Sequence, residues 1–227
     1  MQKLIIFDVD GTLYDLDDVI VQNYKMQIDF VAAKTGKAEC AIIELFEQNG
    51  IFPQVTIASK SATEFFIKSG FSRDEWNAFR EHRFPVDAID CAKAADLKTV
   101  SAFRQFGACV LLSSNSSATI QRILAKIGLG NELFDALVCS DRFPVDGPFN
   151  KKSAMQYLAT RFDVEGPQLI SIGDRFSTDV RPALEIGGTG VVVKKPSSLG
   201  ALLSDMQSNN LRDCDEYEYF CERLPER

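Results

Sequence analysis

Two carboxylates follow an apolar run near the start of the chain, in the segment KLIIFDVDGTLY at residues 3–14. A strand over residues 3–8 would turn Asp8 and Asp10 toward the same side, and Gly11 allows the φ-positive turn that lifts both above the end of the sheet. That end is where parallel sheets bind ligands. Two like charges this close resist ionisation unless a cation lies between them or one holds a proton for catalysis. Both arrangements serve phosphoryl transfer, so the segment is predicted to be a reaction centre.

This segment resembles the first motif of the haloacid dehalogenase-like superfamily, in particular of its phosphatase branch, in which Asp-x-Asp-Gly-Thr/Val follows an apolar strand. A short aspartate-rich motif is weak evidence alone, because capped turns between strands and helices give similar strings. Three further segments match the family's other motifs in the family's order. The resemblance covers the predicted catalytic domain; over residues 16 to about 96 and the tail from about Asp205 it has no comparable specificity.

The second motif is matched by ACVLLSSNSS at residues 108–117, an apolar strand that ends in hydroxyl and amide side chains. In the family this strand ends in Ser or Thr, often followed by Asn, which corresponds to Ser114 and Asn115 here. A hydroxyl and free N–H groups at a helix start favour an anion. The resemblance implies that Ser114, Asn115 and Gly11 bind the substrate. For Ser117 we favour the plainer role of a helix cap.

The fourth motif, Gly-Asp-x-x-x-x-Asp, is matched by LISIGDRFSTDV at residues 169–180. Again an apolar strand delivers carboxylates to its end. Magnesium prefers hard oxygen ligands and keeps some of its water. The resemblance implies a Mg²⁺ site to which Asp10 contributes its backbone carbonyl and in which Asp179 lies outside the first ligand sphere. The predicted metal-site residues are Asp8, Asp10, Asp174 and Asp179.

Lys151 and Lys152 compete for the lysine of the third motif, which in the family neutralises the nucleophile and the substrate phosphate. Lys151 fits better, because Asn-Lys-x-x-Ala at a helix start resembles one common version of that motif. The commoner Lys-Pro version is absent here. The alternative is that both are solvated lysines at a helix start, where a positive charge is mildly unfavourable.

The resemblance implies that Asp8 attacks phosphorus to form an aspartyl-phosphate, while Asp10 protonates the leaving oxygen and later deprotonates water. Mg²⁺ and Lys151 would offset the accumulated negative charge. Dehalogenases of this fold lack an acid/base aspartate at the position of Asp10, and phosphonate-cleaving members have a small residue there and use a cap lysine. Asp10 therefore disfavours both activities.

The expected function is a Mg²⁺-dependent phosphatase of a small phosphorylated metabolite, similar to pyrimidine-nucleotidase-like or phosphoglycolate-phosphatase-like members. A sugar-phosphate mutase shares all four motifs and is one alternative. A non-catalytic binding or regulatory module that keeps the fold is another, although the intact set of catalytic residues favours an enzyme.

Strand and helix patterns alternate from about Lys98 onward, which predicts an α/β fold with a Rossmann-like parallel sheet and helices on both faces. The first strand, over residues 3–8, belongs to the same sheet. Expected strands cover 108–113, 134–139, 168–172 and 190–194, and expected helices cover 98–106, 118–127, 151–162, 177–186 and 198–207.

Residues 16–96 keep helical periodicity throughout and never change to a strand pattern, so they are predicted to form four helices. This insertion resembles the small helical cap of the family, a lid that excludes water and selects the substrate. Lys60 and Arg83 are candidate anion contacts, whereas His82 is expected to be solvated. The predicted domains are a catalytic core of residues 1–15 and 97–207, a cap of 16–96 and a tail of 208–227.

The chain has 227 residues, a formal net charge of −7 and a pI near 4.9, which argues against a nucleic-acid-binding protein. The uninterrupted apolar run before Asp8 has only four residues, too few for a signal-peptide core, and no run elsewhere is long enough to span a membrane. We therefore expect a cytoplasmic protein, monomeric or dimeric. Six cysteines without a Cys-x-x-Cys pair and a single histidine disfavour zinc and fit reduced thiols.

Overall fold

A computed structural model describes residues 2–53, 62–143 and 148–221 of the chain. It divides into two compact units. The core unit comprises Met1–Asp15 and Asp90–Arg227, and the helical unit comprises Leu16–Ile89. The division after Ile89 falls between two short 3₁₀ turns, several residues before the boundary expected near residue 96.

The core unit is built on one six-stranded sheet with the strand order β3-β2-β1-β4-β5-β6. The first five strands are parallel and β6 is antiparallel to β5. This confirms the predicted α/β class with a mostly parallel sheet. The strands are β1 (Lys3–Phe7), β2 (Gly107–Ser113), β3 (Ala136–Cys139), β4 (Leu169–Gly173), β5 (Thr189–Val193) and β6 (Tyr217–Phe220).

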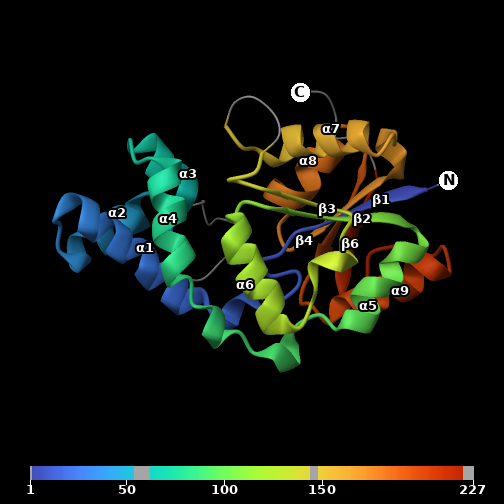
Figure 1. The fold of residues 1–227 in the computed structure, drawn as a ribbon, viewed down its shortest axis with the longest axis horizontal. Coiled ribbons are helices and arrows are strands. Elements are labelled where there is room, and N and C mark those ends of the chain that lie inside the picture. Colours follow the sequence, from blue (N-terminus) through green and yellow to red (C-terminus); the bar gives the residue numbers. More distant parts are fainter. Residues whose placement is uncertain (1, 54–61, 144–147, 222–227) are drawn as a thin grey trace. The chain divides into compact units, whose positions relative to one another are not determined.

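Helices cover both faces of this sheet, with α7 and α8 on one side and α5 and α9 on the other (Figure 1). Alternate residues of the strands explain the two layers, since Leu4 and Ile6 of β1 share one apolar cluster with Met155 and Leu158 of α7. The core helices are α5 (Leu97–Ala102), α6 (Ser117–Ile127), α7 (Lys151–Arg161), α8 (Arg181–Leu184) and α9 (Ser198–Gln207).

The central position of β1 sets the location of the polar residues that follow it. β1 pairs with β2 on one side and with β4 on the other, and the N–H of Asp8 still donates to the carbonyl of Ile172, at 2.9 Å. Asp8 therefore leaves the sheet between the ends of two neighbouring strands. Because parallel strands end at the same edge, the residues after β1, β2 and β4 converge there.

The predicted C-terminal tail contains a strand that the sequence analysis missed. Tyr217 is fully buried, and its hydroxyl donates to Asp205 Oδ2 of α9 at 2.6 Å. On the outer side of β6, the N–H of Tyr219 donates to Asp213 Oδ1 at 2.7 Å, and the Tyr217 carbonyl accepts from the N–H of Cys214 at 3.0 Å. The segment before β6 thus folds along its outer edge.

The helical unit is organised around aromatic side chains. Its helices are α1 (Ile20–Thr35), α2 (Glu39–Gln48), α3 (Ala62–Lys68) and α4 (Arg73–Arg83). The rings of Phe66 and Trp76 are buried and their centroids lie 4.9 Å apart, so both side chains belong to the core of this unit. Lys60 lies outside the described residues.

None of the helices described in residues 2–53, 62–143 and 148–221 has the length and apolar character that crossing a bilayer requires. The six cysteines all lie within these ranges, and each is a free thiol. Cys109 and Cys139 are buried in β2 and β3, as expected for small apolar residues.

Candidate active site

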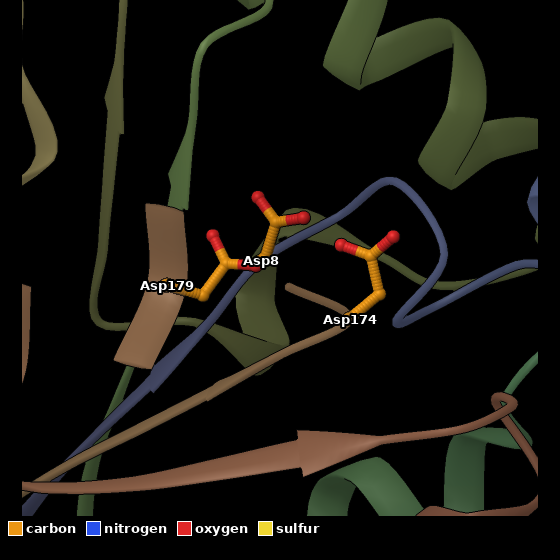
Figure 2. Close-up of side chains that lie close together, drawn as sticks. All are labelled: Asp8, Asp174 and Asp179. Carbon is orange, nitrogen blue, oxygen red and sulfur yellow. The ribbon is translucent and has the colours of Figure 1, made fainter. Parts of the chain in front are cut away.

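Three carboxylates meet at the carboxyl edge of the sheet and form an acid cluster, defined here as Asp8, Asp174 and Asp179 (Figure 2). One oxygen from each lies within 4.8 Å of the others. Asp8 follows β1 and Asp174 follows β4, whereas Asp179 belongs to a π-helical turn over Phe176–Val180. Such turns occur frequently at functional sites. Oxygen donors gathered in this way fit a divalent cation.

Lys151 is a buried cation that bridges two members of the acid cluster. Its Nζ donates to Asp8 Oδ1 and to Asp179 Oδ1, each at 2.6 Å, and its side chain is only 10% exposed. Burial alone would lower the pKa of this lysine, but the two carboxylates raise it above its ordinary value. Lys152, in contrast, is half-exposed and pairs with Glu185 at 2.9 Å, away from the cluster. The geometry therefore favours Lys151 as the site lysine.

The charges of the cluster are not balanced by Lys151 alone. Burial raises the pKa of Asp8 to about 7, against the opposing effect of Lys151 and with the help of Asp179 and Asp10. Burial also raises the pKa of Asp174 well above its usual range, and the charges of Asp179 and Asp8 add to this. Because these carboxylates resist ionisation, a further positive charge at the site would stabilise their ionised forms.

Two glycines permit the close approach of the chain segments that form the cluster. Gly11 has φ +75°, and a Cβ at this position would lie 2.5 Å from Asp174 Oδ2. A Cβ on Gly173 would lie 2.3 Å from Cβ of Asp179. Gly11 was predicted to bind substrate; its observed contact is the packing of its backbone against Asp174.

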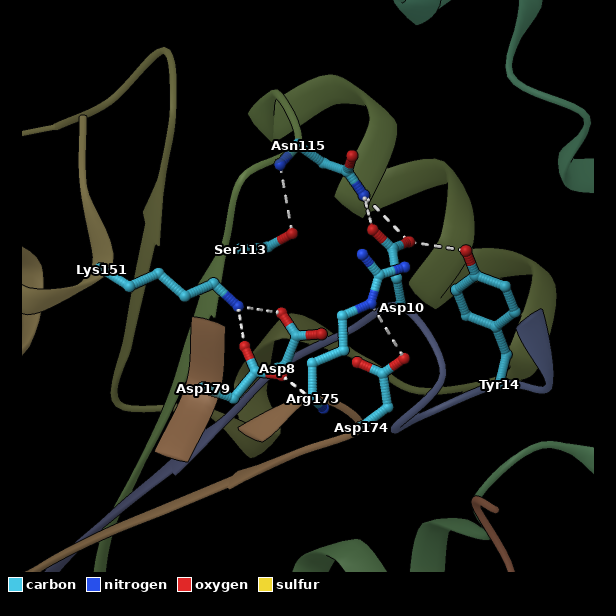
Figure 3. A network of polar contacts seen from close by, with 9 residues as sticks. All are labelled: Asp8, Asp10, Tyr14, Ser113, Asn115, Lys151, Asp174, Arg175 and Asp179. Carbon is cyan, nitrogen blue, oxygen red and sulfur yellow. Dashed lines mark hydrogen bonds and ion pairs between the residues drawn. The ribbon is translucent and has the colours of Figure 1, made fainter. Parts of the chain in front are cut away.

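Asp10 lies outside the acid cluster, and Tyr14 and Asn115 donate hydrogen bonds to it (Figure 3). The hydroxyl of Tyr14 donates to Asp10 Oδ1 at 2.6 Å. The amide Nδ2 of Asn115 donates to Oδ1 at 3.1 Å and to Oδ2 at 2.9 Å. The Asn115 side chain, predicted to bind substrate, is thus directed at a protein carboxylate. The coordination of a metal by the Asp10 carbonyl stays a prediction.

The turn after β2 contains the residues of the predicted phosphate cradle. Ser114 is exposed, and its hydroxyl as a phosphate contact stays a prediction. Ser116 caps α6, whereas Ser117 donates its N–H and its hydroxyl to Asp141, each at 2.7 Å. The first N–H of α6 therefore already has an anionic partner, and the cap is Ser116 rather than Ser117.

Asp141 and Arg175 were missed by the sequence analysis. Asp141 follows β3, so the same rule that located Asp8 and Asp174, a carboxylate after an apolar strand, was a usable signal. Arg175 directly follows Asp174, and its side-chain Nε lies 3.5 Å from Asp174 Oδ2. Its backbone N–H donates to Asp179 Oδ2 at 3.0 Å. A long cationic side chain next to a motif aspartate was the available signal.

A family model described as haloacid dehalogenase-like hydrolase matches residues 2–187. The chain therefore belongs to the haloacid dehalogenase-like (HAD) hydrolases, as the resemblance of its motifs predicted. No curated protein matches the chain in sequence.

Solved structures share the fold at low sequence identity. A HAD phosphatase from Thermococcus onnurineus has a TM-score of 0.60 at 17% identity, over 98% of this chain and 100% of its own. A haloacid dehalogenase-like family hydrolase from Xanthomonas campestris has a TM-score of 0.54 at 19% identity, over 92% and 93%. The putative HAD-hydrolase YfnB from Bacillus subtilis, bound to magnesium, has a TM-score of 0.52 at 14% identity, over 89% and 98%.

We expect the metal-free protein to lose stability as the pH rises from about 4 to about 7. In this range the folded protein keeps a proton on Asp8 that the unfolded chain has released, since folding raises the Asp8 pKa from 3.8 to about 7. A divalent cation would take the place of that proton, so added Mg²⁺ should stabilise the protein more at about pH 8 than at about pH 5. Thermal unfolding with and without Mg²⁺ at both pH values measures this. An equal Mg²⁺ effect at both would contradict it.

Proposed function

We propose that this protein is a Mg²⁺-dependent phosphatase that hydrolyses a small phosphomonoester through an aspartyl-phosphate on Asp8. The observation that carries this proposal is the separation of two carboxylates at one sheet edge. Asp8 lies in the acid cluster and accepts a hydrogen bond from Lys151, whereas Asp10 lies outside this cluster and accepts hydrogen bonds from Tyr14 and Asn115. A nucleophile needs nearby positive charge, and a general acid/base needs a place where it can exchange a proton.

In the proposed reaction Asp8 attacks phosphorus in line with the leaving oxygen. Lys151, which donates to Asp8 Oδ1 at 2.6 Å, keeps the carboxylate oriented and offsets the charge that gathers on the phosphoryl oxygens. Asp10 protonates the leaving oxygen and then takes a proton from the water that releases phosphate. In this proposal Lys151 acts at the attacking carboxylate, and Asp10 acts at the leaving oxygen.

Asp8, Asp174 and the Asp10 carbonyl are the proposed ligands of Mg²⁺, which when bound supplies positive charge to the cluster and to the phosphate. We assign Asp179 to a position outside the first ligand sphere of the metal. Lys151 Nζ already donates to its Oδ1, and the backbone N–H of Arg175 donates to its Oδ2. Asp179 would then orient Lys151 and the segment after Asp174. The solved hydrolase from Bacillus subtilis that is described as bound to magnesium agrees with a metal-dependent reaction.

The carboxylate of Asp10 favours phosphatase over dehalogenase chemistry. Dehalogenation on this fold needs no acid/base at this position. Hydrolysis of a phosphate ester needs one, because the basic leaving oxygen must be protonated. Here the carboxylate is present and is held by Tyr14 and Asn115. We further propose that the helical unit, which contains none of the four motifs, selects the substrate, and that Arg83 contributes there.

We expect hydrolysis of p-nitrophenyl phosphate to require Mg²⁺ and to stop when EDTA is added. Asp174→Ala should lose both turnover and Mg²⁺ binding, because it removes a proposed ligand. Asp179→Asn should weaken Mg²⁺ binding by only about 10–100-fold, the usual effect of an outer-sphere partner. Colorimetric assays and calorimetric Mg²⁺ titrations measure these effects.

The matched control for these variants is Glu185→Gln, which removes a surface carboxylate paired with Lys152. It should leave both activity and Mg²⁺ affinity unchanged. Turnover that persists in EDTA would contradict the metal requirement. Equal losses of Mg²⁺ affinity in the Asp174 and Asp179 variants would contradict the assignment of Asp179 to an outer position.

A further inference from the structure

The hydrogen bond between Tyr14 and Asp10 joins a buried phenol to a partly exposed carboxylate. Tyr14 is fully buried and follows Asp10 by one turn of chain, with a bridge between the two residues. Its hydroxyl donates to Asp10 Oδ1 at 2.6 Å, a short distance typical of a hydroxyl bonded to a carboxylate. Figure 3 shows the phenol group directed at the side of Asp10 that faces away from Lys151.

Asn115, which follows β2, donates hydrogen bonds to the same carboxylate. It is fully buried, and its Nδ2 donates to both oxygens of Asp10. Its Oδ1 is buried and accepts no hydrogen bond from the described residues. A buried acceptor without a partner is unfavourable, but turning the amide around would place Oδ1 against a carboxylate. The contact with Asp10 therefore fixes the orientation of the amide.

We propose that Tyr14 is a positioning residue for Asp10 that supports both protonation states of this acid/base. Asn115 and Tyr14 differ in chemistry as partners of Asp10: an amide N–H₂ can only donate, whereas a hydroxyl can donate or accept. Tyr14 can therefore donate to the carboxylate and, after a rotation of its hydroxyl, accept from the carboxylic acid. This inference rests on the proposed phosphatase function and deepens it.

The proton balance of the reaction shows when this exchange occurs. As the bond between phosphorus and the leaving oxygen breaks, the proton of Asp10 passes to that oxygen and the alcohol departs. Asp10 is then a carboxylate, to which Tyr14 and Asn115 donate. When water attacks the aspartyl-phosphate, Asp10 takes its proton, the Asp8 carboxylate is released and inorganic phosphate leaves. Asp10 ends the cycle protonated, as it began.

The test compares two esters that differ in their need for the proton. Phenoxide is a strong base and needs protonation as it leaves, whereas p-nitrophenoxide is a weak base and leaves without it. The value of kcat/KM reports the steps up to departure of the leaving group, so it isolates the acid role. Tyr14→Phe should lower kcat/KM for phenyl phosphate by about tenfold and for p-nitrophenyl phosphate by less than about threefold. Asp10→Asn should show the same imbalance, with a larger loss.

Tyr217→Phe is the matched control. Tyr217 is also fully buried and donates to a carboxylate, Asp205 Oδ2, at the same distance of 2.6 Å. Both variants lose a part-buried hydrogen bond from a buried phenol to a carboxylate, so their unfolding temperatures should decrease similarly. Only Tyr14→Phe should change the ratio of the two kcat/KM values.

Equal losses for the two esters in Tyr14→Phe, or the same change of ratio in Tyr217→Phe, would overturn the inference. The proposed function would survive that result, provided that the wild-type protein hydrolyses both esters in Mg²⁺. A wild-type protein that hydrolyses neither ester would overturn both the proposed function and this inference. The two failures are therefore distinguishable.

Discussion

Asp8→Asn should reduce phosphatase activity by roughly 10³-fold or more while the protein stays folded. An amide nitrogen or oxygen cannot replace the carboxylate as the nucleophile. The fold should tolerate the change, because burial raises the pKa of Asp8 to about 7 and the ionised side chain is unfavourable above that pH. The neutral amide removes this penalty, and Lys151 keeps its bond to Asp179.

Product release and urea unfolding at about pH 8 measure the two effects of this substitution. The free energy of unfolding without Mg²⁺ should equal or exceed that of the wild-type protein. Substantial turnover in Asp8→Asn would contradict the assignment of the nucleophile. A variant that unfolds would show instead that the Asp8 carboxylate stabilises the fold, against the direction of its pKa.

Lys151→Met should decrease the free energy of unfolding by about 3–5 kcal/mol at neutral to alkaline pH and abolish turnover. The reason is that Asp8 and Asp179 lose the ammonium group that lies 2.6 Å from each. Removing one member of a buried ion pair leaves the remaining charges without compensation. Added Mg²⁺ should recover part of the lost stability, because it supplies positive charge to the same carboxylates.

Lys152→Met is the control for this prediction, since Lys152 occupies the next position of the same helix. Its ammonium group pairs with Glu185 at the surface, with 46% of the side chain exposed, so the change should cost about 0–1 kcal/mol. Urea unfolding of both variants with and without Mg²⁺ tests the difference. Similar losses in the two variants would remove Lys151 from its proposed role.

The parts of the fold that the sequence predicted well are those governed by local pattern. Apolar runs ending in Asp8, Ser113 and Asp174 mark β1, β2 and β4. The parallel arrangement then places their ends together without any further information. The same logic singled out Asp8, Asp10 and Asp174, which are the proposed nucleophile, the proposed acid/base and a proposed metal ligand.

The parts that the sequence did not predict depend on contacts between distant segments. Tyr217–Phe220 forms a strand because β5 offers a free edge and Asp205 a partner for the Tyr217 hydroxyl, and neither is visible in the local pattern. The helix expected over 177–186 begins instead as a π-helical turn before α8. The contact of Asn115 with Asp10 joins residues from separate motifs, so the hydrophobic periodicity of the sequence does not predict it.

The segment beside β6 has a consequence for how copies of the protein behave toward one another. An open strand edge can recruit a strand from a second molecule and so begin aggregation. Here the outward N–H of Tyr219 and the outward carbonyl of Tyr217 already bond to Asp213 and Cys214. Another strand would have to displace these bonds before it could pair with β6. The end of the sheet is thereby protected from edge-to-edge growth by the chain itself.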